Sequence, residues 1–344
     1  MQIPVKAVPF AEVWRGDMIE SLHDGHAVVC GADGQIVMAW GDPEAVIYPR
    51  SSCKMIQALP LIESGASEAF KLSPAQLALA CASHQGAPLH VNRINAWLAD
   101  MGMSDDDFRC GPQMTRDTDL RDAMIRAGDA PCQVHNNCSG KHAGFLTLNR
   151  HLGGNAEYVA VDHPVQLAAK QAFEEVTEVT SPGYGIDGCS APNHATTLHG
   201  LARAMAMFAS AHTRSDTRSR AAAALTQAMM AYPELVSGEQ FVSGESGACT
   251  VLMRAMGGKV AVKTGAEGVF VAILPEQQLG VALKIVDGAT RASECAIVAL
   301  LVKLGALDPA HPVAQHYAAA PMLNRRDIVT GFVKPSATLR GAAA

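Results

Sequence analysis

The chain has 344 residues and a net charge of −6; 49% of its residues are hydrophobic and 17% are charged. This composition excludes an intrinsically disordered chain and is sufficient for one large or two ordinary domains with a substantial core. The sequence has no basic patch interleaved with aromatic side chains, so nucleic acids and anionic membranes are poor candidates for partners. No stretch approaches eighteen uninterrupted apolar residues, so no membrane span is expected.

The chain contains nine cysteines, an odd number. Its first residues lack a basic segment followed by a long apolar run, so we expect no signal peptide and a cytoplasmic location. In a reducing compartment the cysteines would be free thiols or metal ligands rather than a disulfide framework.

The N-terminal part of the sequence predicts strands followed by a helix. Two apolar runs, 27–30 and 35–40, flank Gly31-Ala32-Asp33-Gly34, which is a hairpin signal, and Val13-Trp14 with 19–22 suggest an earlier strand pair. Apolar residues spaced three and four apart then predict a helix over 51–64 that ends near Gly65.

The middle of the chain is mostly helical in pattern. Ser73-Pro74 is a typical helix start, with an N-cap followed by proline at the first position. Two loop-rich islands, 132–142 and 181–193, interrupt the helical segments, and such islands often carry functional groups. Beyond the helix that starts at Ser73, the periodicity predicts helices over 88–101, 116–128, 139–151, 163–177, 194–212 and 219–231.

Strand patterns return near the C-terminus. We expect a helix at 246–256, a three-stranded meander, an apolar helix at 292–304 and one more strand at 327–333. The predicted fold class is therefore α+β, with a central antiparallel sheet from the N- and C-terminal segments flanked by helices and an inserted, mostly helical subdomain. The predicted boundaries are a single domain at 1–334, with the sheet part at 8–65 and 245–334, the helical subdomain at 66–244 and a flexible tail at 335–344.

Ser51 and Lys54 form a Ser-x-x-Lys motif at the start of the first predicted helix. A serine hydroxyl is a poor nucleophile unless a base takes its proton, and a neutral lysine one helical turn away can be that base. Taken alone, the motif is short and common, and an N-cap serine followed by a surface lysine is the favoured interpretation. A second motif, Lys263-Thr264-Gly265 on a late strand, favours the catalytic interpretation of Ser51 and Lys54.

These two motifs match, in order and in context, two of the three marks of the serine β-lactamase and penicillin-binding protein fold. The third mark, Ser-Asp-Asn in the helical part, is missing. Ser83, at a predicted helix end, is where a second hydroxyl could stand, although by itself it is equally an ordinary helix-end residue.

Cys138 and Lys141 lie three residues apart at the start of a predicted helix, and Cys189 lies in the second loop island. Two cysteines from separate loops could bind zinc as thiolates together with a nitrogen ligand and water. His135 is the first candidate for that nitrogen, and Lys141 is possible only when neutral. The alternative is that these are buried free cysteines that pack as small apolar side chains.

Taken together, these motifs resemble the rhizobial-type (class 3) L-asparaginases, and the resemblance runs from about residue 8 to 333. It implies a fold related to serine β-lactamases and glutaminases, a homodimer, and hydrolysis of L-asparagine to L-aspartate and ammonia. The residues that carry it are Pro49-Arg50-Ser51 with Lys54, Ala82-Ser83-His84 with Gly86, Asn137-Cys138-Ser139-Gly140-Lys141-His142, Asp187-Gly188-Cys189 and Lys263-Thr264-Gly265.

The resemblance also assigns roles to individual residues. It implies two Ser-Lys pairs in one cleft, Ser51 with Lys54 and Ser83 with Lys263. It further implies a zinc ion held by two cysteines and a lysine, a role that falls on Cys138, Lys141 and Cys189 and replaces His135 as the nitrogen ligand. Arg50, Asp187 and Cys249 match further residues that support the site or bind the substrate.

Three other functions remain open at this point. A glutaminase is close, because one additional methylene in a substrate is discriminated only modestly by a pocket. A β-lactamase or peptidase would act outside the cytosol, and a non-catalytic zinc-containing binding protein would have no use for the Ser and Lys pairs. The sequence has no Gly-Thr dipeptide, which separates it from asparaginases that use a threonine nucleophile.

Overall fold

The computed structural model describes residues 6–239 and 247–340. Its contacts divide the chain into two compact units. The sheet unit comprises 1–52, 196–210 and 251–344, and the helical unit comprises 53–195 and 211–250. The division differs from the expected boundaries, because the helical unit begins at Cys53 and the segment 196–210 belongs with the sheet.

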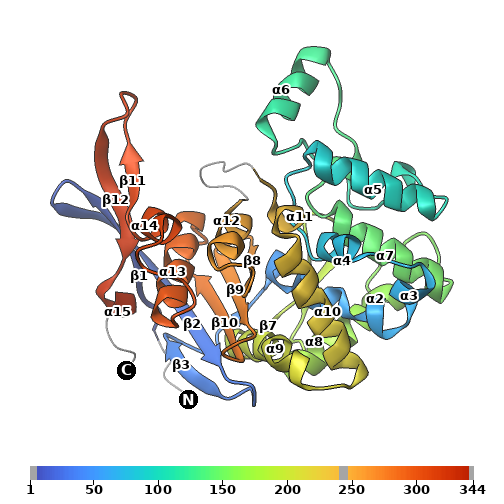
Figure 1. The fold of residues 1–344 in the computed structure, drawn as a ribbon, viewed down its shortest axis with the longest axis horizontal. Helices are drawn as coiled ribbons and strands as arrows, with labels where there is room; N and C mark the ends of the chain where they lie inside the picture. Colours follow the sequence, from blue (N-terminus) through green and yellow to red (C-terminus); the bar gives the residue numbers. More distant parts are fainter. Residues whose placement is uncertain (1–5, 240–246, 341–344) are drawn as a thin grey trace. The chain divides into compact units, whose positions relative to one another are not determined.

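Within the described residues, eight antiparallel strands form the sheet of the sheet unit (Figure 1). Their order is β11-β12-β1-β2-β10-β9-β8, and β3 pairs with β2. The N-terminal strands β1 and β2 therefore lie between C-terminal strands in one sheet, which confirms the predicted α+β class. The strands are β1 (Val8–Arg15), β2 (Met18–Cys30), β3 (Ile36–Trp40), β8 (Ala261–Gly265), β9 (Val269–Leu274), β10 (Leu279–Ile285), β11 (Ala320–Leu323) and β12 (Val329–Pro335).

The sequence pattern explains why these segments form strands. The predicted hairpin around Asp33-Gly34 is confirmed, with β2 and β3 paired from Ala27 opposite Trp40. The predicted meander is confirmed as β8, β9 and β10. Every residue of β9 is buried, as expected for a central strand made only of apolar side chains.

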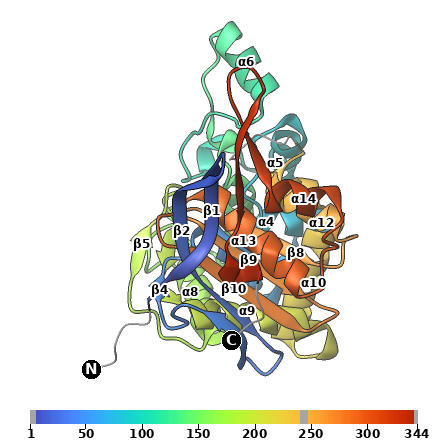
Figure 2. The same ribbon diagram turned by 90° about the vertical axis from the view of Figure 1, so that its left-hand side faces the viewer.

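Helices cover the sheet within its own unit. α9 (Leu198–Ser210) packs against β2, β9 and β10, and α13 (Thr290–Lys303) packs against β1, β9, β10 and β12 (Figure 2). α14 (Pro312–Ala318) and α15 (Ala337–Arg340) lie against β12. A short strand pair, β4 (Val46–Ile47) with β7 (Thr196–Thr197), joins the start of α9 to the N-terminal segment.

The helical unit carries a second short strand pair, β5 (Tyr184–Ile186) with β6 (Pro192–His194). The predicted start of α4 is confirmed, because the Ser73 side chain caps its backbone and Pro74 follows. The helices are α1 (Lys54–Gln57), α2 (Leu59–Glu63), α3 (Ala66–Ala69), α4 (Pro74–Ala80), α5 (Pro88–Asp100), α6 (Thr118–Ala127), α7 (Ser139–Leu152), α8 (Pro164–Thr177), α10 (Thr217–Ala231) and α11 (Pro233–Ser237).

Short 3-10 helices complete this unit or lead into it: η1 (Arg50–Cys53), η2 (Asp105–Asp107), η3 (Gln133–His135) and η4 (Ala211–Thr213). α12 (Ala248–Ala255) crosses the division between the two units.

Several boundaries differ from the sequence prediction. The helix expected over 51–64 is divided into η1, α1 and α2; Pro60, which has no N–H to donate, lies in the first turn of α2. The tail expected at 335–344 contains α15, and residues 341–344 lie outside the described part, as does Ser246 at the start of the helix expected there. None of the described helices is long and apolar enough to cross a membrane.

Candidate functional site

Ser51 lies in the tight turn of η1, at the end of the N-terminal segment of the sheet unit. Arg50 adopts a left-handed backbone conformation with φ of 53°, which is uncommon for a residue with a side chain and often marks a functional turn. The turn is held by Ser52, whose N–H and hydroxyl both donate to the Pro49 carbonyl, at 3.2 and 2.7 Å.

The Lys-Thr-Gly strand packs against this turn within the same unit. A Cβ on Gly265 would lie 2.6 Å from the Pro49 carbonyl oxygen, so only glycine permits the approach. Lys263 is fully buried, and its ammonium group donates to the Thr264 carbonyl at 2.8 Å. Two motifs that are about two hundred residues apart in the sequence therefore meet in the sheet unit.

Lys54 begins α1 in the helical unit and is almost completely buried. Its amine contacts three acceptors: the Ala82 carbonyl, the Ser83 hydroxyl at 3.0 Å and the Cys138 sulfur at 3.1 Å. A buried lysine is costly unless its N–H groups are satisfied, and these three contacts satisfy them. The lysine of the first motif therefore lies hydrogen-bonded to Ser83, the second serine implied by the resemblance.

A histidine beside Ser83 is held in one tautomer. The backbone N–H of Gly86 donates to His84 Nδ1 at 3.1 Å, which leaves Nε2 as the protonated nitrogen. Nε2 lies 3.0 Å from Ser139 Oγ and donates to it, and the Ser139 hydroxyl donates to the Val134 carbonyl at 2.8 Å. Burial lowers the pKa of His84 well below its usual range, with neighbouring positive charges adding to the effect.

This network connects the two segments that hold the Lys54 partners. Ser83 directly precedes His84, and Cys138 directly precedes Ser139. The backbone N–H of Ser83 donates to the Val236 carbonyl at 2.9 Å, which joins the Ser83 segment to the residues of α11 as well. His84 has no role that its sequence motif predicts, although its position next to Ser83 is the available signal.

Cys138, Lys141 and Cys189 form one buried cluster. The Lys141 amine donates to the Cys189 sulfur at 3.0 Å, and the Cys138 thiol is hydrogen-bonded to the same sulfur. That hydrogen bond, together with the Lys141 charge, holds the pKa of Cys189 well below its usual range, whereas the bond and burial raise the pKa of Cys138 to about 12. Burial lowers the pKa of Lys141, but the two sulfurs outweigh it and raise the pKa overall.

The donor set of this cluster fits a zinc ion. Two sulfurs and an amine nitrogen lie together, and zinc favours sulfur and nitrogen ligands. The N–H···S and S–H···S contacts place protons between atoms that a metal would join, and zinc binding releases such protons. No group of three or more His, Cys, Asp or Glu side chains suited to a metal occurs among the described residues.

The other predicted residues lie as follows. His135 is engaged elsewhere, because its Nδ1 accepts the Cys132 N–H at 3.2 Å and lies 3.1 Å from the Cys132 sulfur. Asp187 shapes the turn before Cys189: its N–H donates to the Ala191 carbonyl at 2.9 Å and its carboxylate accepts the Gly188 N–H at 2.8 Å. Cys249 is fully buried in α12.

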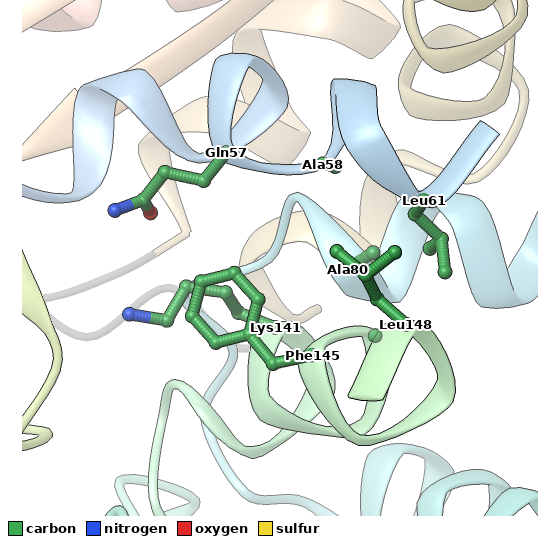
Figure 3. Close-up of a pocket in the computed structure, with 8 residues that line it drawn as sticks. Gln57, Ala58, Leu61, Ala80, Lys141, Phe145 and Leu148 are labelled. Carbon is green, nitrogen blue, oxygen red and sulfur yellow. The ribbon is translucent and has the colours of Figure 1, made fainter. Parts of the chain in front are cut away.

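A small cavity of about 10 Å³ extends from Lys141 into the helical unit, between apolar side chains of α2, α4 and α7 (Figure 3). Figure 3 shows the Gln57 amide and the Lys141 amine pointing to the same side, away from Leu61 and Leu148. Phe145, one turn after Lys141, places its ring 5.3 Å from the amine. The cavity has room for about one water molecule and is too small for a substrate.

Known structures with a related arrangement are only distantly similar. One is a penicillin-binding protein homologue from Pyrococcus abyssi, with a TM-score of 0.41 at 11% identity over 83% of this chain and 75% of its own. Another is a proposed β-lactamase from Bacteroides dorei, with a TM-score of 0.40 at 12% identity over 76% of this chain and 84% of its own. A β-lactamase from Mycobacterium bovis has a TM-score of 0.36 at 13% identity, over 81% of this chain and 94% of its own. These scores support no statement about activity.

The sequence itself gives a firmer result. The family model of L-asparaginase II matches residues 11–335, nearly the whole length. The chain belongs to this family and is an enzyme, an amidohydrolase of the asparaginase type. No curated protein matches the sequence.

Proposed function

We propose that this protein hydrolyses L-asparagine to L-aspartate and ammonia, with an activated serine as the nucleophile. The observation that carries the proposal is Lys54, a buried amine bonded to the Ser83 hydroxyl at 3.0 Å and to the Cys138 sulfur at 3.1 Å. A buried amine in direct contact with a serine hydroxyl is the arrangement that a lysine base needs.

In the proposed reaction Ser51 attacks the side-chain amide carbon and forms an acyl-enzyme. Lys54, when neutral, takes the proton of the attacking hydroxyl. Backbone N–H groups near Ser51 are the source of oxyanion stabilisation, and Arg50, whose conformation shapes the turn, serves as a supporting residue. Asp187 and Cys249 stay in supporting or substrate-binding roles, as the resemblance implies.

Ser83 and Lys263 are assigned to proton transfer. They would pass a proton to the leaving ammonia and later help to activate the water that hydrolyses the acyl-enzyme. Ser83 also has a direct hydrogen bond to Lys54, so it is the alternative nucleophile. Ser51→Ala should abolish acylation, and a fully active Ser51→Ala variant would transfer the nucleophilic role to Ser83.

Cys138, Lys141 and Cys189 would hold a zinc ion. When bound, zinc supplies a positive centre that can orient the α-amino and carboxylate groups of the substrate. Removal of zinc by a chelator should then raise KM more than it lowers kcat. If chelation abolishes turnover at saturating asparagine while the fold survives, the orienting role is wrong.

The deciding experiment measures ammonia release from L-asparagine and, in parallel, from L-glutamine, with protein of known zinc content. Turnover of asparagine without glutamine supports the proposal. Turnover of glutamine alone makes the protein a glutaminase. Release from neither substrate, in folded and zinc-loaded protein, overturns the proposal and directs attention to acylation of Ser51 by a β-lactam.

The resemblance also implies a homodimer, which we include in the proposal. Light scattering on the purified protein, with a mass near twice the 36.1 kDa of one chain, would support it. A monomer mass at the concentrations used for activity would refute it.

A further inference from the structure

A second and larger cavity opens in the helical unit, away from the cluster of Cys138, Lys141 and Cys189. Its volume is about 280 Å³. On one side it is lined by α8 and the loop before it, including Asp162, Leu167 and Lys170, and on the other by the β5–β6 hairpin, including Tyr184 and His194.

The most informative residue of this cavity is His194, at the end of β6. The residue is only 9% exposed, and no hydrogen bond joins its imidazole to any residue that the structure describes, although neither ring nitrogen is a fully enclosed atom. The rings of Phe173 and Tyr184 pack around it at 6.4 and 5.8 Å between centroids. Because its ring nitrogens are not fully enclosed, the imidazole in the cavity wall can take a hydrogen-bond partner that enters from the cavity.

The charged groups of the cavity suggest what that partner is. Lys170 places its ammonium group 3.8 Å from the Glu174 carboxylate, a loose pair on the surface of α8 that contributes little. The same carboxylate also accepts the Ser181 N–H at 2.9 Å. Lys170 is therefore available to an incoming anionic group, and Asp162, an exposed carboxylate of the lining, is available to a cationic one.

The remaining wall is apolar. Leu167 and Tyr184 are 50% and 47% exposed, although large apolar side chains are usually covered. A cavity of this volume is below the size typical for drug-like ligands and suits a smaller molecule.

We propose that this cavity binds a free amino acid, with the ligand's carboxylate at Lys170 and His194, its ammonium at Asp162 and its side chain against Leu167 and Tyr184. The ligand would give His194 the hydrogen bond that the protein does not supply. Burial lowers the pKa of His194, so its imidazole is neutral and can donate one hydrogen bond to a carboxylate.

The cavity is connected to the candidate site by one hairpin. Tyr184 and His194 are paired residues at the open end of β5–β6, and the loop that joins the two strands carries Asp187 and Cys189. An amino acid that fixes the open end of the hairpin would therefore influence the position of Cys189, as in a coupling between two sites. This second part of the inference rests on the proposed function, since it takes Cys189 to be part of the active site.

Binding is tested first, on the intact zinc-loaded chain. L-leucine, L-lysine and L-aspartate, none of which has a side-chain amide to hydrolyse, are titrated separately by calorimetry. We expect at least one to bind, and its Kd to rise about tenfold or more in Lys170→Met and in His194→Phe, because each loses a hydrogen bond to a charged group. Lys259→Met, which removes a surface lysine of the sheet unit, is the matched control and should bind as the wild type does.

The outcomes are distinct. If none of the three amino acids binds, or if both cavity variants bind as tightly as the control, the inference is wrong. Binding to the active site alone would give Kd values that Lys170→Met and His194→Phe leave unchanged. Because calorimetry does not depend on turnover, the result stands even if the protein releases no ammonia from asparagine.

The coupling is tested by hydrogen–deuterium exchange. The amino acid that binds should slow exchange of the loop amides of Asp187 and Ser190, which donate to the Ala191 and Asp187 carbonyls at 2.9 Å. The protection should disappear in His194→Phe. Protection confined to α8 and the ends of the hairpin, with none in the loop, would overturn the coupling. In an active enzyme the same ligand should also change KM for asparagine in the wild type and not in His194→Phe.

Discussion

The interiors of the two units differ in kind. In the sheet unit the central strands bury almost only apolar side chains, and all six residues of β9 are buried. In the helical unit the interior also holds two lysines, Lys54 and Lys141, and several histidines, among them His84 and His142. Burying such groups is costly unless they are paired, and a hydrophobic replacement of equal volume would often be more stable. The difference indicates that the helical interior is organised around polar chemistry, whereas the sheet interior is mostly apolar packing, with Glu12, His23 and Lys263 among its buried polar residues.

The largest effect is expected from Lys54→Met, which keeps the length of the side chain and removes the amine. If the buried amine acts in catalysis, kcat for asparagine should fall about 10⁴-fold, or about 5.5 kcal/mol in activation free energy, as for loss of a general base. Ammonia release at saturating asparagine measures it.

Lys71→Met is the matched control in the same unit, because Lys71 is exposed. It should retain wild-type kcat. A Lys54→Met enzyme with more than a tenth of wild-type kcat would mean that the buried lysine is structural, and the contrast between the two interiors would lose its functional meaning.

The opposite result is expected for a core residue of the sheet. Phe10 on β1 is fully buried, and Phe10→Ala should reduce the free energy of unfolding by about 4 kcal/mol through lost burial and the remaining cavity. Activity per folded molecule should stay near the wild-type value. Chemical denaturation gives the first quantity and ammonia release at a temperature well below the transition gives the second. A selective loss of kcat would show that the sheet interior is tied to the chemistry.

A smaller effect should follow from the histidine beside Ser83. His84→Leu removes the donor to Ser139 Oγ, and we expect kcat to fall about 30-fold, or about 2 kcal/mol, because the Ser83 segment is no longer held to the Cys138 segment. His84→Gln, whose amide can still donate at a similar reach, should recover much of the loss.

The control for this prediction is a second buried histidine. His163 caps α8 by accepting the Val165 N–H at 3.2 Å, so His163→Gln tests burial without a link to Ser83. His84 acts through Ser83 only if His84→Leu has little further effect on kcat in a Ser83→Ala background. Equal losses of kcat in the wild-type and Ser83→Ala backgrounds would show that His84 contributes only packing.

The sequence predicted the sheet better than the helical interior. Alternating and continuous apolar runs around Asp33-Gly34 and over 261–285 are local signals, because strand pattern and turn chemistry act over a few residues. Other elements lacked such a signal. β11 and α14 are short, and the helix expected over 51–64 is interrupted where Pro60 replaces a backbone donor.

The candidate site was predictable only in part. Motif spacing identified Ser51, Lys54 and Ser83, but no spacing reveals that the Lys54 amine contacts Ser83 and Cys138, which are 29 and 84 residues away in the chain. The metal ligands came from family resemblance, since isolated cysteines resemble core residues in sequence. The cavity beside His194 had no sequence signal at all, because it depends on the packing of α8 against a hairpin.

The smallest predicted effect concerns a charged group that the sheet unit buries without a partner. Glu294 on α13 is partly buried, and no residue in the described ranges pairs with it; burial raises its pKa to about 7. The protonated form is thus favoured in the folded protein. Its contribution to stability is fully present below the unfolded pKa of about 4.5 and is lost as the pH rises through about 7.

Glu294→Gln removes this titration while keeping the shape of the protonated side chain. The wild type should lose about 1–2 kcal/mol of unfolding free energy relative to the variant between pH 5 and pH 8, a value discounted for partial exposure. Denaturation curves of both proteins at the two pH values give the difference, and titrations shared by both cancel. A constant difference would mean that Glu294 is ionised and solvated throughout. The sheet unit would then hold no unpaired buried charge, and the contrast with the helical unit would be sharper than proposed.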